Sequence, residues 1–372
     1  MKKFVNKDLS IINYQPEIDC LRAVAVFFVI LFHFELFNVT GGFIGVDVFF
    51  VISGYLITSL VIKDLVKNKF SLVDFYLRRI RRIIPNLYFI IFLTLIFGYF
   101  ILSPDHFNRI SKSSVAATTA YSNFFFWSES GYFDLDKFFK PLLHTWSLSI
   151  ELQLYVIWPI LIVIIFKLFR DKMKLLIITI ILLSLFLSTI YSHRITGFFY
   201  FTLFRMFEFG IGSITYLIQK DIKLKKNDTI FFIGLLVIIF SSFIFTENSI
   251  FPGSNALLPC LGTSLILLTA GKIIYFKKFF INKFLIFLGK ISYSLYLVHW
   301  PIVVFYRYMK LEPLIFFEKI FLIFITIVIS SFTYKFIETP FRSRINSKYL
   351  INSKNIIFIL FLSLSTIFVT SK

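Results

Sequence analysis

The sequence contains eleven long apolar stretches, and this feature limits the chain to a small set of folds. A transmembrane helix needs about 20 consecutive apolar residues, and the stretches approach or exceed that length. Hydrophobic residues make up 58% of the chain, against about 45–50% in soluble domains. We therefore predict an all-α polytopic membrane protein with about 10–11 transmembrane helices. The expected spans are residues 18–38, 46–62, 83–102, 143–166, 175–191, 198–218, 229–246, 256–271, 284–306, 315–337 and 355–370. The longest connection between spans is 103–142.

The same pattern excludes several classes of protein. Continuous apolar runs do not suit a soluble enzyme, a disordered chain or a fibrous repeat. They also exclude an outer-membrane barrel, whose strands alternate apolar and polar residues. Cys20 and Cys260 lie far apart without a C-x-x-C spacing, so we expect neither a metal site nor a disulfide framework.

The distribution of basic residues predicts the orientation in the membrane. With a cytoplasmic N-terminus, the inner segments carry 28 Lys and Arg residues and the outer segments carry 8. Basic loops remain on the cytoplasmic side, so we predict the N-terminus inside and the C-terminus outside. The net charge of +19 is explained by this retention, and we expect no nucleic-acid partner.

Arg22 and His33 are two of the polar residues within the first expected span. Arg22 and His33 are eleven residues apart, which is about three helical turns, so both lie on one face. A single histidine in an apolar segment is more often a packed core side chain than a catalytic one. An arginine on the same face favours function, because charges inside the membrane are costly and mark functional sites.

A glycine-rich segment, residues 41–47, precedes the second span and ends in Asp47. Its glycines permit a tight turn and close backbone approach. Asp47 is interpreted either as a helix N-cap or as a partner that orients the imidazole of His33.

Four arginines precede the third span: Arg78, Arg79, Arg81 and Arg82. Arg78 and Arg81 share a helical face, as do Arg79 and Arg82. They are interpreted either as anchors on the cytoplasmic side or as a phosphate site, because the guanidinium group matches phosphate oxygens.

Further acid–base groups lie in later spans. His144 and Glu151 are seven residues apart, about two turns, near the outer end of the fourth span. Arg205 and Glu208 are expected to form a structural pair, and His299 to lie at a kink before Pro301. The sequence thus predicts two clusters. The inner one comprises Arg22 and the four arginines 78, 79, 81 and 82; the outer one comprises His33, Asp47, His144 and Glu151.

These motifs, in this order, resemble the membrane acyltransferase-3 family, the O-acetyltransferase type that modifies bacterial surface polysaccharides. The resemblance covers residues 14–342. It rests on segments 14–22, 41–47, 49–58, 78–85, 144–151 and 291–301, together with the spacing from Arg22 to His33.

The resemblance implies an integral membrane O-acyltransferase of the bacterial inner (cytoplasmic) membrane. It would move an acetyl group from cytoplasmic acetyl-CoA to a hydroxyl of an extracytoplasmic envelope polysaccharide, such as O-antigen of lipopolysaccharide, capsule or peptidoglycan. Acetyl-CoA is the expected donor substrate and no metal is expected. An alternative from another class is a transporter or flippase of a lipid-linked saccharide.

The resemblance also implies roles for individual residues. Arg22 and His33 form the family's Arg-x10-His motif, with His33 as general base or acyl carrier. Asp47 and Glu151 match functional acidic positions. Arg78 and Arg81 form the Arg-x-x-Arg motif expected to bind the phosphates of coenzyme A, with Arg79 and Arg82 beside them.

This sequence departs from the family pattern at two positions. Cys20 stands where glycine is usual, and Leu152 where glutamate is frequent, which leaves Glu151 as the carboxylate of its motif. Residues 1–345 are expected to form the acyltransferase domain and 346–372 an extra transmembrane helix. Many relatives continue into an outer hydrolase-like domain, so a separate extracytoplasmic partner is an open expectation.

Overall fold

The computed structural model describes residues 14–130, 137–192, 197–222, 227–310 and 312–342. These residues form α-helices joined by short turns, and they contain no strand. The α-helices are α1 (Pro16–His33), α2 (Gly45–Val66), α3 (Leu72–Ile101), α4 (Pro104–Thr118), α5 (Ser122–Ser128), α6 (Thr145–Leu168), α7 (Met173–Tyr191), α8 (Met206–Asp221), α9 (Asp228–Ile244), α10 (Leu257–Thr269), α11 (Tyr275–Phe280), α12 (Lys283–Lys290), α13 (Ser292–Lys310), α14 (Phe316–Thr333) and α15 (Thr339–Arg342). Short 3₁₀-helices also occur, at η1 (Gly42–Ile44), η2 (Lys137–Phe139), η3 (Arg170–Lys172), η4 (Phe198–Tyr200), η5 (Thr202–Arg205) and η6 (Gly253–Ala256). A π-helix, η7 (Tyr334–Glu338), follows α14.

The predicted all-α membrane fold is confirmed. Within the residues that the structure describes, five helical segments are long and apolar enough to cross a bilayer, and the pair α12–α13, bent by 69°, makes a sixth. Apolar side chains cover much of the outer surface: Phe100 on α3 and Phe317 on α14 are each 79% exposed. Together with these apolar helices, such exposed apolar side chains indicate a multi-pass membrane protein.

Ten of the eleven expected spans fall within described residues, and each coincides with a helix or a pair of helices. The helices α8, α9 and α10 have 16, 17 and 13 residues, so the count of 10–11 crossings stays a prediction. The span expected at 355–370 lies outside the described residues, and so does the 346–372 segment. The predicted orientation is not tested by the structure.

Two segments differ from expectation. Helix α3 begins at Leu72 rather than near 83, because Ser71 caps it by accepting a hydrogen bond from the Asp74 N–H. The four arginines therefore lie inside a helix. The connection 103–142, expected as a loop, contains the helices α4 and α5.

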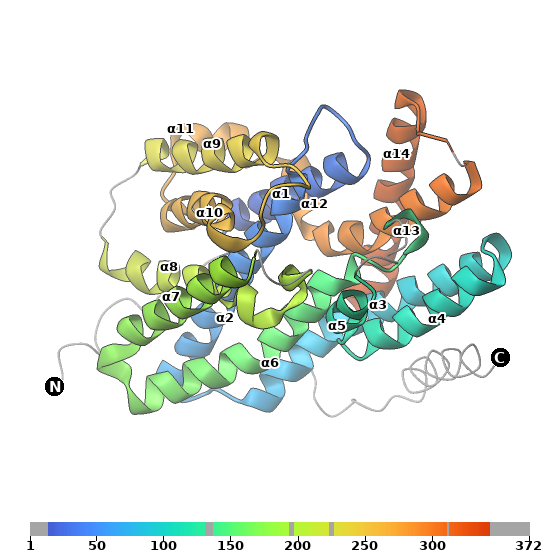
Figure 1. Cartoon of the computed structure of the whole chain (residues 1–372). Coiled ribbons are helices and arrows are strands. Elements are labelled where there is room, and N and C mark those ends of the chain that lie inside the picture. Colours follow the sequence, from blue (N-terminus) through green and yellow to red (C-terminus); the bar gives the residue numbers. More distant parts are fainter. Residues whose placement is uncertain (1–13, 131–136, 193–196, 223–226, 311, 343–372) are drawn as a thin grey trace.

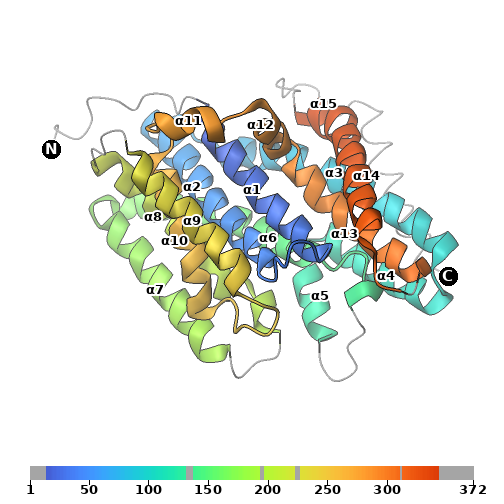
Figure 2. The same ribbon diagram turned by 90° about the horizontal axis from the view of Figure 1, so that it is seen from above.

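Helix α1 runs through the middle of the molecule and carries the first motif (Figures 1 and 2). Helices α7 to α10 lie on one side of it, and α3, α4, α13 and α14 lie on the other. Helix α1 packs against α2, α12 and α13. Residues of α1 therefore face both halves of the molecule.

Glycines bring the backbones of α1, α2 and α8 into direct contact. A Cβ atom at Gly45 would lie 2.3 Å from the carbonyl oxygen of Ala25 on α1. One at Gly54 would lie 2.1 Å from the carbonyl oxygen of Phe209 on α8. The close approach expected for the segment 41–47 is confirmed.

Candidate active site

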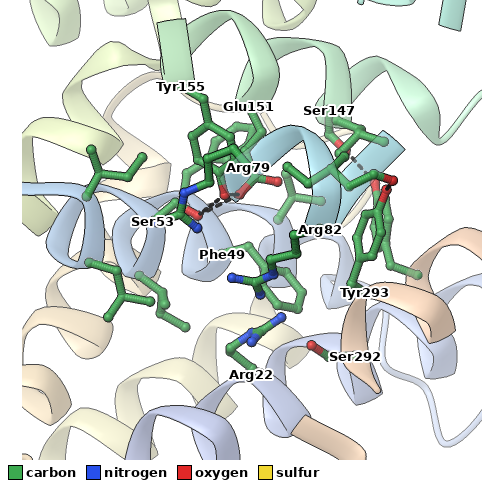
Figure 3. Close-up of a pocket in the computed structure, with 18 residues that line it drawn as sticks. Arg22, Phe49, Ser53, Arg79, Arg82, Ser147, Glu151, Tyr155, Ser292 and Tyr293 are labelled. Carbon is green, nitrogen blue, oxygen red and sulfur yellow. Dashed lines mark hydrogen bonds between the residues drawn. The ribbon is translucent and has the colours of Figure 1, made fainter. Parts of the chain in front are cut away.

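An inner cavity of about 70 Å³ lies where α1, α2, α3, α6 and α13 meet. Arg22 projects into it from α1, and Arg79 and Arg82 project from successive turns of α3 (Figure 3). Glu151 of α6 is the carboxylate among its lining residues. The remaining polar lining consists of hydroxyl groups, those of Ser53, Ser147, Tyr155, Ser292, Tyr293 and Tyr296.

Glu151 belongs to this inner cavity, so its predicted place in the outer cluster is wrong. Its Oε1 accepts hydrogen bonds from Ser53 Oγ at 2.6 Å and from the Tyr155 hydroxyl. The guanidinium of Arg79 lies over the Tyr155 ring, 5.2 Å from its centroid. The carboxylate is therefore held by two hydroxyls close to the arginines.

The arginine cluster is divided by the packing of α3. Arg79 and Arg82 line the inner cavity, on the same helical face as the buried Phe75 and Asn86. Arg78 is exposed and forms an ion pair with Asp64 at 3.8 Å, and Arg81 is not among the lining residues. The pair that reaches the cavity is thus not the pair that the family resemblance assigned to phosphate.

A basic vestibule of about 610 Å³ adjoins the inner cavity. The two spaces share Arg22, Leu56 and Arg82 among their lining residues. Two more cationic side chains line the vestibule, those of Lys290 and Arg342. Asp19 adds a carboxylate, whose Oδ1 lies 3.9 Å from Arg22 Nη1. The vestibule therefore offers several cations on the path to the inner cavity.

An outer cavity of about 260 Å³ lies at the other end of α1. His33, the last residue of α1, lines it together with His144, which directly precedes α6. Lys137 and Arg205 bring positive charge. The rest is mostly aromatic: Phe32, Phe43, Trp146, Phe199, Phe251, Tyr296 and Trp300.

The partner of His33 is a second histidine. His33 Nδ1 lies 3.0 Å from His299 Nε2, and the two rings are stacked with centroids 5.1 Å apart. The Trp300 ring is 4.6 Å from His33 on another side. His33 and His299 are 266 residues apart in the sequence, and nothing in their spacing indicated this contact.

Asp47 does not orient His33, and that interpretation is wrong. Its Oδ1 accepts a hydrogen bond from Arg205 Nη1 at 2.7 Å, and the same nitrogen donates to Glu208 Oε1 at 2.8 Å. The predicted pair of Arg205 and Glu208 is confirmed, with Asp47 as its third member. All three side chains are at most 4% exposed, so this triad is a buried ion cluster beside the outer cavity.

Tyr296 and Val46 line both the inner and the outer cavity. The Tyr296 hydroxyl lies 2.5 Å from Ser147 Oγ and donates to the carbonyl oxygen of His144 at 3.0 Å. These contacts hold its ring between the two spaces. The vestibule, the inner cavity and the outer cavity thus follow one another along α1.

Sequence reasoning missed two residues that the structure brings to the site, Tyr296 and His299. Both lie in the segment 291–301 that carried part of the family resemblance. They are three residues apart, which places them on one helical face. A tyrosine three residues before the histidine of this motif is a signal that could have selected both residues.

Comparison with known proteins identifies a family and relatives for this chain. A family described as "Acyltransferase domain" matches residues 15–336. The O-acetyltransferase OatA of Staphylococcus aureus is 34% identical over 351 residues, covering 89% of this chain and 58% of OatA. A putative O-acetyltransferase of the same species is 34% identical over 354 residues, again 89% of this chain and 58% of that protein. No solved structure matches.

The chain therefore spans somewhat more than half the length of these curated relatives. The family match itself covers nearly all residues that the structure describes. It includes the motif residues that line the two cavities, from Arg22 to Tyr296. This chain belongs to the acyltransferase-3 family of membrane proteins.

Proposed function

We propose that the protein is an O-acetyltransferase that takes an acetyl group from acetyl-CoA and delivers it to a hydroxyl of an envelope polysaccharide. The observation that carries this proposal is the contact between the two cavities at Tyr296 and Val46. A cationic space and a histidine-containing space adjoin there, as transfer from one side of a membrane to the other requires. The relatives named O-acetyltransferase support the reaction type.

The donor would enter through the basic vestibule. Coenzyme A carries phosphate groups, and guanidinium groups form charge-assisted, often bidentate hydrogen bonds to phosphate. Arg22 and Arg82 line both the vestibule and the inner cavity. We assign the phosphates to the vestibule and the narrower acyl-bearing arm to the inner cavity, which places the vestibule on the cytoplasmic side.

The acceptor would enter the outer cavity. Its aromatic walls with a few polar groups match the usual lining of a small-molecule pocket. Lys137 and Glu247 form an ion pair within this lining. An envelope glycan such as O-antigen, capsule or peptidoglycan supplies suitable hydroxyls, and a separate extracytoplasmic partner could present it.

His33 is the proposed catalytic residue. As a general base it takes the proton of the attacking hydroxyl while the carbon–sulfur bond of the thioester breaks and the thiolate leaves, to be protonated afterwards. As an acyl carrier its nitrogen first displaces the thiol, and the hydroxyl then takes the acetyl group from the imidazole. Both routes need an unprotonated ring nitrogen that faces the outer cavity.

The test is an assay of acetyl transfer in isolated bacterial cytoplasmic membranes that contain the full chain. Acetyl-CoA should be consumed with release of free thiol, and the envelope glycan should gain the mass of an acetyl group. The His33→Ala variant should do neither. A transporter or flippase would move saccharide without releasing thiol, and that result would overturn the proposal.

A further inference from the structure

We propose that His299 is a positioning residue that fixes the tautomer of His33 and so places the reactive lone pair on its Nε2. This inference rests on the proposed role of His33 and adds a residue with a different task. Its basis is a chain of two hydrogen bonds, from a backbone carbonyl through one imidazole to the other.

The chain begins at the backbone of α13. His299 Nδ1 lies 3.1 Å from the carbonyl oxygen of Leu295, one turn earlier in the same helix. A carbonyl oxygen can only accept, so His299 Nδ1 must carry the proton. In a neutral imidazole the other nitrogen, Nε2, is then an acceptor.

The second link follows from the first. His299 Nε2 lies 3.0 Å from His33 Nδ1, and because Nε2 accepts, His33 Nδ1 must donate. A charged imidazolium at His299 would reverse this assignment, but His299 is 0% exposed. A buried charge without a carboxylate partner is costly, and no described carboxylate forms an ion pair with this ring. The neutral form is therefore favoured.

The consequence is a defined reactive atom. With its proton on Nδ1, neutral His33 carries the lone pair on Nε2. His33 lines the outer cavity, whereas His299 is absent from that lining. His299 thus supports the reaction without touching the substrate, as the aspartate of a Ser-His-Asp triad does when it fixes the tautomer of its histidine.

The packing around His33 adds orientation to the tautomer. Its ring lies 5.0 Å from Phe32 and 4.6 Å from Trp300. The Trp300 indole is itself anchored, since its Nε1 donates to the Lys140 carbonyl oxygen at 2.9 Å. Adjacent residues of α13, His299 and Trp300, therefore hold the His33 ring by a hydrogen bond and by contact.

The first test compares two substitutions at position 299. His299→Leu fills the space but removes the acceptor, so kcat should fall at least about 10-fold, part of the roughly 10²–10⁴-fold that a positioned acid–base group contributes. The KM for acetyl-CoA should stay within about 2-fold. His299→Gln supplies an amide that can accept from Nδ1, and it should recover most of kcat.

A control variant shows whether the fall in kcat is specific to His299 or follows the removal of any histidine. His106 stacks on Phe139 with centroids 4.9 Å apart and lines none of the three cavities. His106→Leu should leave kcat unchanged. Wild-type kcat in His299→Leu, or equal loss in the Leu and Gln variants, would overturn the inference while His33→Ala still tests the proposed function separately.

The second test reads the tautomer in the unmodified protein. The chain has five histidines, so ¹⁵N-histidine labelling gives a spectrum simple enough to assign His33 by its absence in His33→Ala. The ¹⁵N shifts should show a protonated Nδ1 and a bare Nε2 at His33. A proton on Nε2 would overturn the inference, whatever the variants do.

Discussion

The inner and outer cavities lie next to each other along α1, yet their chemistry is different. The inner cavity brings three guanidinium groups together with one carboxylate, Glu151, and a set of hydroxyls. The outer cavity has two imidazoles in its lining, a third behind them, and aromatic walls. Its charged lining residues are already paired within the protein, Lys137 with Glu247 and Arg205 with Asp47 and Glu208. Fixed charges suit binding of an anionic donor, whereas neutral imidazoles suit proton or acyl transfer. Arg22, which lines the donor side, and His33, the proposed catalytic residue, thus lie toward opposite ends of the same helix, α1.

The largest effect is expected at His33. His33→Ala removes the proposed base or acyl carrier, so acetyl transfer should fall by roughly 10²–10⁴-fold. Insertion into the membrane should be normal, because α1 keeps its apolar face. Acetylated glycan and thiol release are the measurements, and His106→Ala is the control. Wild-type transfer by His33→Ala would move the chemistry away from the outer cavity.

The buried triad should matter for stability rather than for binding. Arg205→Leu leaves Asp47 and Glu208 buried without their cation, and breaking such a cluster costs about 3–5 kcal/mol. Thermal unfolding in detergent should show this loss. The control is Lys174→Leu, which breaks a pair with Asp221 whose side chains are 51% and 57% exposed and should cost at most about 1 kcal/mol. Equal losses would contradict the structural role assigned to Asp47.

Substitution of the arginines that line the inner cavity should change the KM for acetyl-CoA. Arg22→Ala combined with Arg82→Ala removes the two cations that line both the vestibule and the inner cavity. Each charged hydrogen bond is worth about 1.5–3 kcal/mol, so the KM for acetyl-CoA should rise at least about 10-fold. Arg78→Ala, at the exposed pair with Asp64, should change KM by less than about 2-fold. The reverse result would return the phosphate role to Arg78 and Arg81, as the family resemblance implied.

The smallest effect is expected where the two cavities meet. Tyr296→Phe removes a hydroxyl that contacts Ser147 and His144, and loss of such a hydrogen bond is worth about 0.5–1.5 kcal/mol. Transfer should fall by about 2- to 10-fold. The matched control is Tyr293→Phe. The Tyr293 hydroxyl donates to the Ile83 carbonyl oxygen, and Tyr293 lines the inner cavity but not the outer one.

A change of volume at the same position tests whether the Tyr296 ring separates the two cavities. Tyr296→Ala should join the two spaces and let water reach the donor, so the ratio of hydrolysed to transferred acetyl should rise. That ratio is measured from thiol release with and without acceptor glycan. An unchanged ratio would mean that Tyr296 does not separate the cavities.

The fold was largely predictable because its signal is local. Continuous apolar runs require helices in a bilayer, and ten expected spans coincide with helices in the described part of the chain. Helix ends were less well predicted. The expected span began near residue 83, whereas α3 begins after Ser71. Ser71 and Asp74 form an S-x-x-D pattern, a helix-start signal that the apolar run alone does not include.

The candidate site was predictable in its residue types but not in its pairings. Arg22, His33, Asp47 and Glu151 were selected because charges inside a membrane are rare. Their partners depend on which helices pack together. Asp47 pairs with Arg205 and Glu151 with Ser53, because α2 packs against both α8 and α6. Tyr155, the other partner of Glu151, lies four residues along α6 itself.

The sequence by itself determined that this chain is helical, lies in a membrane, and carries the ordered motifs of an acyltransferase. These properties follow from hydrophobicity and from residue identity along the chain. Only the tertiary structure decided that Arg79 and Arg82, rather than Arg78, reach the inner cavity, and that His299 supports His33. The physical reason is that a buried hydrogen bond depends on distance in space, and residues 33 and 299 become neighbours only when α1 packs against α13.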